Sequence, residues 1–186
     1  MKIENFSISG FKIIKPEIYD DNRGYFLESY NKKRYQEIIG NEDFVQDDHS
    51  FSNKNVLRGI HFQITNPQEQ LIYLASGKVF FVVVDFRPNS KTFLNHLSFE
   101  IDSSKHYQIF QPKGVGSGYY TLTDDVNILY KVTKLYGENK EEGVCWNDPT
   151  LKIQWPCDDP VVSEKDQRNK IISDIDFKQY PDLMEL

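Results

Sequence analysis

The sequence is short of the features that mark several classes of protein. Its only two cysteines, Cys145 and Cys157, have no metal-like spacing. The longest apolar run, Val79 to Val84, is far too short to cross a bilayer. The first ten residues have no basic region followed by a long apolar stretch, so no signal peptide is expected. We therefore expect a protein of the reducing cytoplasm.

The chain also lacks an excess of basic residues. It has 22 Lys and Arg against 28 Asp and Glu, a formal net charge of −6, which makes a nucleic-acid-binding surface unexpected. An anionic small molecule is still compatible if a few arginines converge. No repeat, low-complexity tract or linker divides the 186 residues, so residues 1–186 are expected to form one domain.

Aromatic residues are abundant, with 13 Phe and 11 Tyr, and short β-like runs separated by turn residues predict an all-β fold, a sandwich or a barrel. Helical signal is confined to Lys32–Ile39, which Gly40 ends, and to a second candidate after Ser163. The predicted strands are Phe6–Ile14, Tyr25–Ser29, Gln70–Ala75, Lys78–Asp85, Leu94–Ile101, Tyr107–Phe110, Gly118–Thr123 and Val126–Thr133.

The segment Val56–Gln63 holds the densest group of reactive residues. Strand alternation places Arg58, with Ile60 and Phe62, on one face and His61, with Leu57, Gly59 and Gln63, on the other. A histidine inside a barrel can act as a general base near neutral pH. The residues alone equally allow a hydrogen-bonded core histidine.

A metal site of the kind that β-barrels build from His-x-His and a later histidine is not expected. Gln63 stands at the second position, and the late turn offers Ser117. One imidazole without clustered partners is a poor transition-metal site.

Several motifs in a fixed order resemble the dTDP-4-dehydrorhamnose 3,5-epimerase family. The resemblance runs over nearly the whole chain. It is carried by Asp21–Glu28, Phe44–Asp47 with Ser50 and Ser52, Leu57–Gln63, Val84–Ser90, Leu129–Lys131, Trp146–Pro149 and Ser163–Asp166.

The resemblance implies a homodimeric, cupin-type jelly-roll β-barrel with a few short helices toward the termini. It implies an isomerase that inverts C3, C5 or both in a nucleotide-linked 4-keto-6-deoxy sugar. A base removes a proton beside the ketone, and an acid returns one from the opposite face. The ketone supplies the acidity, so no cofactor is expected.

On that template His61 matches the base, Asp166 the carboxylate that orients it, and Tyr130 the acid. Each residue also has a structural reading. Ser163 and Asp166 are spaced like a helix capping box, Tyr130 could be an inward-facing strand residue, and Asp148 is a second candidate for the carboxylate.

The resemblance also implies a set of substrate-binding residues. Arg23 and Arg58 match diphosphate-binding arginines, which bind in a bidentate way that lysine cannot. The remaining matches are Gln46 in the same region, Tyr136 near the nucleotide base, and Phe26 and Glu28, which would reach the nucleotide from the partner subunit.

Three residues depart from the family pattern in or near this predicted site. Gln70 stands where a lysine is usual, Ser117 replaces the histidine of Ala-His-Gly, and Asp48 replaces the asparagine of Gln-Asp-Asn. Losing a cation beside a developing oxyanion should weaken its stabilisation by a few kcal/mol. These changes suggest a divergent relative, such as a GDP-4-keto-heptose 3- or 3,5-epimerase of capsule or lipopolysaccharide biosynthesis.

Two other functions remain compatible with the sequence. A 3,4-ketoisomerase would share the barrel and the enolisation but would move the carbonyl group. A non-catalytic barrel that binds nucleotide sugars would explain Gln70 and Ser117, although it would not need His61, Asp166 and Tyr130.

Overall fold

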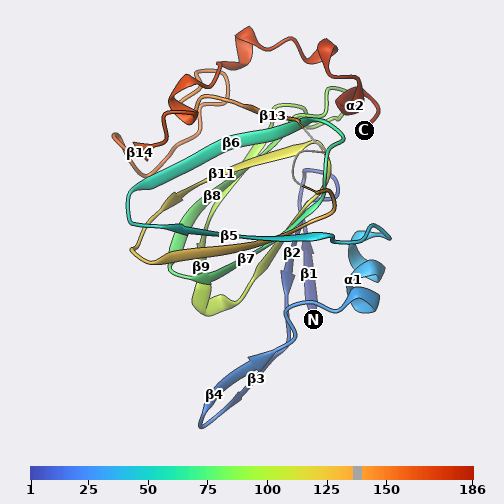
Figure 1. The fold of residues 1–186 in the computed structure, drawn as a ribbon, viewed down its shortest axis with the longest axis vertical. Coiled ribbons are helices and arrows are strands. Elements are labelled where there is room, and N and C mark those ends of the chain that lie inside the picture. The colour runs from blue at the N-terminus through green and yellow to red at the C-terminus, as the bar shows by residue number, and fades with distance from the viewer. Residues whose placement is uncertain (136–139) are drawn as a thin grey trace.

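The computed structural model describes residues 1–135 and 140–186, most of them in two facing β-sheets (Figure 1). The first sheet has the order β1-β2-β10-β7-β12-β5. Its strands are β1 (Lys2–Asn5), β2 (Lys12–Lys15), β5 (Gln46–Ser52), β7 (Gln70–Ser76), β10 (Gln108–Gln111) and β12 (Val126–Val132).

The second sheet has the order β13-β6-β11-β8-β9, and β14 (Val161–Val162) pairs in parallel with β6. Its strands are β6 (Val56–Thr65), β8 (Lys78–Asp85), β9 (His96–Asp102), β11 (Val115–Thr121) and β13 (Lys140–Gly143). The other strand pairs are antiparallel, and the two sheets enclose a jelly-roll barrel, as predicted. A separate hairpin, β3 (Ile18–Asp21) and β4 (Gly24–Leu27), projects away from both sheets (Figure 1).

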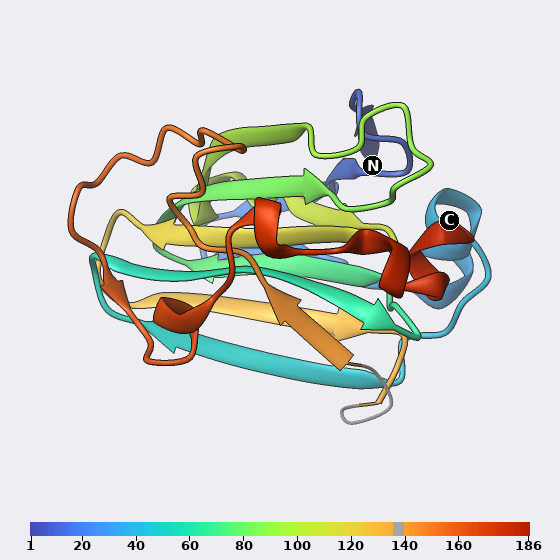
Figure 2. The ribbon, with the colours of Figure 1, turned by 90° about the horizontal axis from the view of Figure 1, so that it is seen from above.

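Strand β8 shows why the longest apolar run belongs to this fold. Val79, Phe81 and Val83 face the interior between the sheets. Val82 and Val84 face outward and are buried under the C-terminal segment, which lies over the second sheet (Figure 2). Because both faces are covered, the strand is apolar at nearly every position.

The helix predicted at Lys32–Ile39 is confirmed as α1 (Lys32–Ile39). The Asn31 side chain caps it by accepting a hydrogen bond from the Arg34 backbone N–H, and Gly40, with φ of 100°, ends it. No helix within residues 1–135 or 140–186 is long and apolar enough to span a membrane.

The second predicted helix, after Ser163, is not continuous. The segment forms the short turns η2 (Asp166–Arg168), η3 (Ile172–Asp174) and η4 (Phe177–Gln179), and then α2 (Pro181–Met184); another short turn, η1 (Ser103–Lys105), follows β9. The backbone of the segment after Ser163 pairs with other parts of the chain and does not form a long helix. The Ile172 N–H donates to Asp148 Oδ2, and Lys170 pairs with Val144.

The predicted strand Phe6–Ile14 was wrong over most of its length. Only its last three residues belong to a strand, β2, because β1 ends at Asn5 and a turn with Gly10 at φ of 82° lies between the two strands. Strand β5 was not predicted. Its sequence, Gln46-Asp-Asp-His-Ser-Phe-Ser52, is largely polar, since it is an edge strand exposed at most positions.

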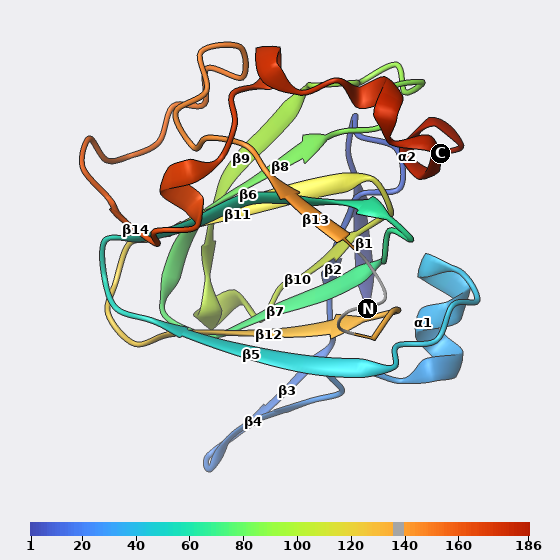
Figure 3. The same ribbon diagram turned by 45° about the horizontal axis from the view of Figure 1, so that its top comes forward.

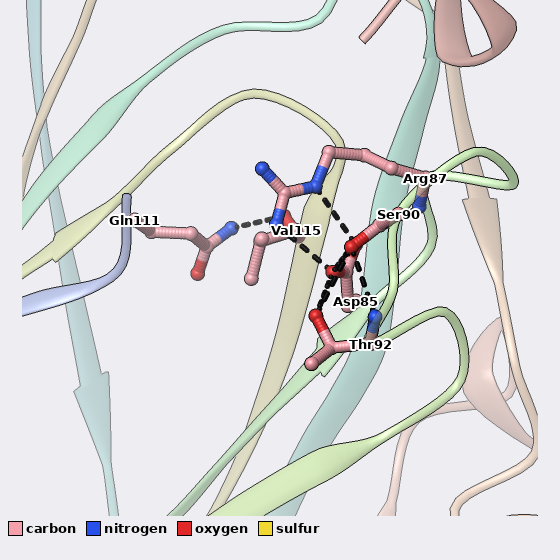
Figure 4. A network of polar contacts seen from close by, with 6 residues as sticks. All are labelled: Asp85, Arg87, Ser90, Thr92, Gln111 and Val115. Atoms are coloured by element: carbon pink, nitrogen blue, oxygen red, sulfur yellow. Dashed lines mark hydrogen bonds and ion pairs between the residues drawn. The ribbon is translucent and has the colours of Figure 1, made fainter. Parts of the chain in front are cut away.

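A buried carboxylate closes the turn between β8 and β9 (Figure 4). Asp85 is fully buried, and the Arg87 guanidinium binds it in a bidentate way, at 2.8 Å from Nε and 2.9 Å from Nη2. The hydroxyls of Ser90 and Thr92 donate to the same carboxylate at 2.6 and 2.7 Å. Burial raises the pKa of Asp85, but these donors outweigh it and hold the pKa below its usual value.

We expect Asp85→Asn to destabilise the fold by roughly 3–5 kcal/mol, because it leaves Arg87 buried without its counter-charge. Asp21→Asn is the matched control, since Asp21 binds Arg23 with the same spacing at an exposed site. It should leave the unfolding free energy nearly unchanged. Denaturant unfolding measures both variants, and equal losses would contradict the prediction.

The lowered pKa of Asp85 also predicts how the stability of the fold depends on pH. A lowered pKa in the folded state means that Asp85 contributes its stability fully above the unfolded-state pKa. The contribution is lost as the pH falls through the folded-state pKa. The difference between parent and Asp85→Asn should therefore shrink in acid.

Candidate active site

A cavity of about 850 Å³ lies between the two sheets, and residues of the edge strands β5 and β13 are among those that line it. The opposite edge of the barrel is filled by aromatic contacts of Phe99 with Phe6 and Phe11. His61, on β6, and Tyr130, on β12, line the cavity from opposite sheets. Figure 3 shows the two strands that carry them, β6 and β12, facing each other. Any ligand held between the sheets therefore has one of these side chains on each side.

His61 is bound to Asp166 on its own side of the cavity. His61 Nε2 lies 2.6 Å from Asp166 Oδ1, and Asp166 Oδ2 accepts the Gly59 backbone N–H at 3.2 Å. Burial raises the pKa of Asp166. The hydrogen bond to His61, the charge of His61 and the hydrogen bond from the Gly59 N–H outweigh burial and hold this pKa below its usual value. Asp166 is therefore an anion in the folded state, although its side chain is only 4% exposed.

The strand carrying His61 departs from regular alternation at Gly59. Ser117 pairs with His61, and Tyr119 pairs with Arg58, so the ladder shifts by one residue between them. The expectation that Arg58 and His61 face opposite sides was wrong, because the shift turns both toward the cavity.

Glycine is required at this shift. Gly59 has φ of 104°, and a Cβ there would lie 2.7 Å from the Gly118 Cα and from the Ser117 carbonyl oxygen. The close approach of β6 and β11 depends on the missing side chain.

Ser163 and Asp166 have both of the roles that their spacing allowed. The Asp166 backbone N–H donates to Ser163 Oγ at 3.1 Å, while its carboxylate binds His61. The cap thus fixes the backbone from which the carboxylate extends.

The second candidate carboxylate, Asp148, does not bind His61. It accepts the backbone N–H groups of Thr150, Leu151 and Ile172 at 2.7 to 2.9 Å. Asp148 therefore ties the turn that begins at Asp148 to the segment that follows Asp166.

Tyr130 belongs to a group of hydroxyls that connects the two sheets. Its hydroxyl lies 3.4 Å from Ser50 Oγ, which lies 3.2 Å from the Tyr119 hydroxyl. Ser52 Oγ accepts a hydrogen bond from Arg58 Nε at 3.0 Å and lies 3.3 Å from the Tyr119 hydroxyl. Burial, followed by the neighbouring Tyr119, raises the pKa of Tyr130 far above its ordinary value, so the phenol keeps its proton.

The cavity brings together the catalytic candidates and five of the predicted binding residues, which are Gln46, Asp48, Arg58, Gln70 and Ser117. Gln46 Nε2 donates to Asp48 Oδ1 at 2.8 Å. The side chains of Gln70 and Ser117 also line the cavity, and neither makes a hydrogen bond to another described residue.

Four predicted binding residues are not in this cavity. Arg23 and Phe26 lie on the projecting hairpin, where the Arg23 side chain is 85% exposed and Phe26 is 71% exposed. Glu28 follows the hairpin and accepts hydrogen bonds from Arg34 and Asn31. Tyr136 lies outside the described residues.

Sequence reasoning missed several polar residues that line the cavity. They are Gln63, Gln68, Gln111, Lys134, Glu141 and Lys165. Strand register is the signal that finds some of them. Gln111 pairs with Gln70, and Glu141 pairs with Gln63. Glu141 Oε1 lies 3.8 Å from His61 Nδ1 and 2.7 Å from Lys165 Nζ.

The described residues do not form a metal centre. Across residues 1–135 and 140–186, no three His, Cys, Asp or Glu side chains come close enough to hold a metal ion.

Comparisons with known proteins decide the family. The family model described as dTDP-4-dehydrorhamnose 3,5-epimerase matches residues 5–174. The chain belongs to this family. It is 38% identical to the dTDP-4-dehydrorhamnose 3,5-epimerase of Pseudomonas aeruginosa over 178 residues, covering 95% of this chain and 98% of the relative.

Solved structures of similar proteins support the same family. The dTDP-6-deoxy-D-glucose-3,5-epimerase of Legionella pneumophila, in complex with dTDP-4-keto-L-rhamnose, has a TM-score of 0.90 and 39% identity, covering 96% of both chains. A 3'-monoepimerase from Streptomyces bikiniensis, in complex with dTDP-quinovose, has a TM-score of 0.84 and 30% identity, covering 90% of this chain and 86% of that one. This family member is an epimerase of nucleotide-linked 4-keto-6-deoxy sugars, as the sequence predicted.

Proposed function

We propose that His61, Asp166 and Tyr130 are the catalytic residues of this epimerase. The observation that carries the proposal is the 2.6 Å bond between His61 Nε2 and Asp166 Oδ1, opposite Tyr130 across one cavity. A base and an acid on opposite sides of a sugar are what inversion of a carbon beside a ketone requires.

Asp166 selects the nitrogen of His61 that acts as the base. An ionised carboxylate can only accept a hydrogen bond, so Nε2 carries the proton and Nδ1 keeps its lone pair. Nδ1 takes the proton from the carbon beside the ketone, and the electrons move onto the carbonyl oxygen to give an enolate. The resulting imidazolium is stabilised by the Asp166 carboxylate.

Tyr130 completes the inversion. Since its pKa is raised, the phenol is protonated at neutral pH and donates its proton to the enolate carbon from the opposite face. Gln70 and Ser117 face the same cavity and can donate neutral hydrogen bonds to the enolate oxygen.

The nucleotide that we propose is thymidine diphosphate. The solved relatives named above carry dTDP-linked sugars, and these ligands support dTDP over the GDP carrier suggested by the three sequence departures. The cations that line the cavity in the described part of the chain, Arg58, Lys134 and Lys165, come from β6 and from segments flanking β12 and β14. We place the diphosphate among these three side chains. The two free thiols, Cys145 and Cys157, fit a cytoplasmic location.

We further propose a homodimer in which each hairpin completes the partner's site. Arg23 and Phe26 are exposed, and they lie on the hairpin β3–β4, which projects away from both sheets. An exposed phenylalanine beside an arginine suits stacking on a base and binding of a phosphate, which a second copy could offer.

Mixed dimers test the shared site. Arg23→Ala and His61→Asn chains, each with its own affinity tag, are co-expressed, and dimers carrying both tags are purified. If Arg23 acts on the partner's site, one site in each mixed dimer is intact and about half of the parent activity returns, as closed two-fold symmetry requires. Mixed dimers as inactive as the two single variants would mean that Arg23 serves its own chain.

A further inference from the structure

A network of hydroxyls ends at the proposed proton donor. Its members, in the order in which they contact one another, are Ser52, Tyr119, Ser50 and Tyr130, with oxygen–oxygen distances of 3.3, 3.2 and 3.4 Å. The network joins the two sheets, since Tyr119 lies on β11 and the other three members lie on β5 and β12, which face β11 (Figure 3). Arg58, on β6, donates from Nε to Ser52 Oγ at 3.0 Å, so a cation stands at the far end of the network.

Arg58 fixes the direction of the hydrogen bonds, because a guanidinium can donate but cannot accept. Ser52 accepts from Arg58 and is 3% exposed, so its own proton needs an acceptor inside the protein. Among the described residues, the Tyr119 hydroxyl is its remaining partner. Tyr119 then accepts from Ser52 and donates to Ser50. Ser50 in turn donates to the phenol oxygen of Tyr130.

This direction leaves the proton of Tyr130 for the cavity. Because the phenol oxygen accepts from Ser50, its own proton takes no part in the network and is available to a group in the cavity that Tyr130 lines. In the opposite direction Tyr130 would donate to Ser50, and the proton of Ser52 would be buried beside the Arg58 cation without an acceptor. A buried donor left unmatched is unfavourable, so the structure supports the first direction.

The contact with Ser50 also suits the phenolate that remains after Tyr130 has given its proton to the enolate carbon. A hydrogen bond to an anion is shorter and stronger than one to a neutral phenol, and a contact of 3.4 Å leaves room to shorten. Burial, followed by Tyr119, raises the pKa of Tyr130, whereas the hydrogen bond to Ser50 and the charge of Arg58 lower it. Ser50 therefore opposes the effect of burial on the acid.

We propose that Ser50 is a positioning residue for the proton donor: its hydroxyl directs the proton of Tyr130 into the cavity and then stabilises the phenolate. This inference rests on the proposed role of Tyr130 as the acid, and it adds the group that orients the transferred proton.

The test replaces Ser50 with alanine and measures deuterium uptake and inversion separately in D₂O. His61 and Asp166 are unchanged, so uptake should stay within about twofold of the parent's. Inversion should fall by about tenfold or more, because the phenolate loses a hydrogen bond. The ratio of uptake to inversion should therefore rise by about tenfold. Ser50→Thr keeps the hydroxyl and should restore the parent ratio. Ser98→Ala, at an exposed position on β9, is the control and should not change it.

Two results would overturn the inference. One is a parent-like ratio in a folded Ser50→Ala, shown by a parent-like melting transition. The other is an equal loss of uptake and inversion, which would make Ser50 part of the cavity wall alone. If Ser50→Ala does not fold, Ser50→Cys decides between the same results, because a thiol fills the position and donates only weakly.

The network also predicts a difference between its members. Tyr119→Phe removes the donor to Ser50 but leaves the Ser50 hydroxyl beside Tyr130, so its ratio should stay close to the parent's. The proposed function fails in a different way. A parent ratio in Tyr130→Phe would contradict the acid itself, whereas a parent ratio in Ser50→Ala alone would leave Tyr130 as the acid and remove only the role of Ser50.

Discussion

Replacement of His61 by asparagine is expected to lower solvent deuterium uptake and epimerisation together, by about 10²–10⁴-fold. Asparagine can keep a hydrogen bond to Asp166, so the cavity should stay intact. It has no lone pair able to take a proton from carbon, so the enolate does not form. Mass spectrometry of the recovered sugar in D₂O measures uptake, and NMR of the product measures inversion.

His49→Asn provides the matched control for this substitution. His49 lies on β5, is exposed and is bound to Asn127 through Nε2 at 2.8 Å, and it does not line the cavity. The control should take up deuterium at nearly the parent rate. Parent-like uptake by His61→Asn would remove His61 from the mechanism, whatever the fold.

The jelly-roll barrel could be predicted because its signals are local or carried by ordered motifs. Strand β8 spans Lys78–Asp85, and helix α1 spans Lys32–Ile39, as predicted, since each has a clear turn or cap at its ends. Strand β5 could not be predicted in the same way. Its sequence is largely polar and has no alternating apolar pattern, so the strand depends on its pairing with β12.

Prediction of the candidate site from the sequence was limited in a similar way. Residues embedded in motifs, such as His61 and Asp166, could be found one at a time, but their relative placement depends on a shift in the ladder. Strict alternation separated Arg58 from His61, and only the irregular pairing of β6 with β11 at Gly59 brings both to the cavity.

Substituting phenylalanine for Tyr130 is expected to separate two steps that His61→Asn removes together. Phenylalanine fills nearly the same space but has no proton to give, so inversion should fall by about 10²–10⁴-fold. His61 and its bond to Asp166 are untouched, so the enolate still forms. His61 can then return a deuteron to the face from which it took the proton. Deuterium uptake with retained configuration should therefore persist in Tyr130→Phe.

Tyr119→Phe is the control that makes this result specific. Tyr119 belongs to the same group of hydroxyls, through Ser50 and Ser52, and it is 4% exposed, so its loss disturbs the same network. It lies beside the proposed proton donor but does not replace it. Its inversion rate should fall much less than that of Tyr130→Phe, and its ratio of uptake to inversion should stay close to the parent's. If Tyr130→Phe keeps that parent ratio as well, then Tyr130 only shapes the cavity and another group protonates the enolate.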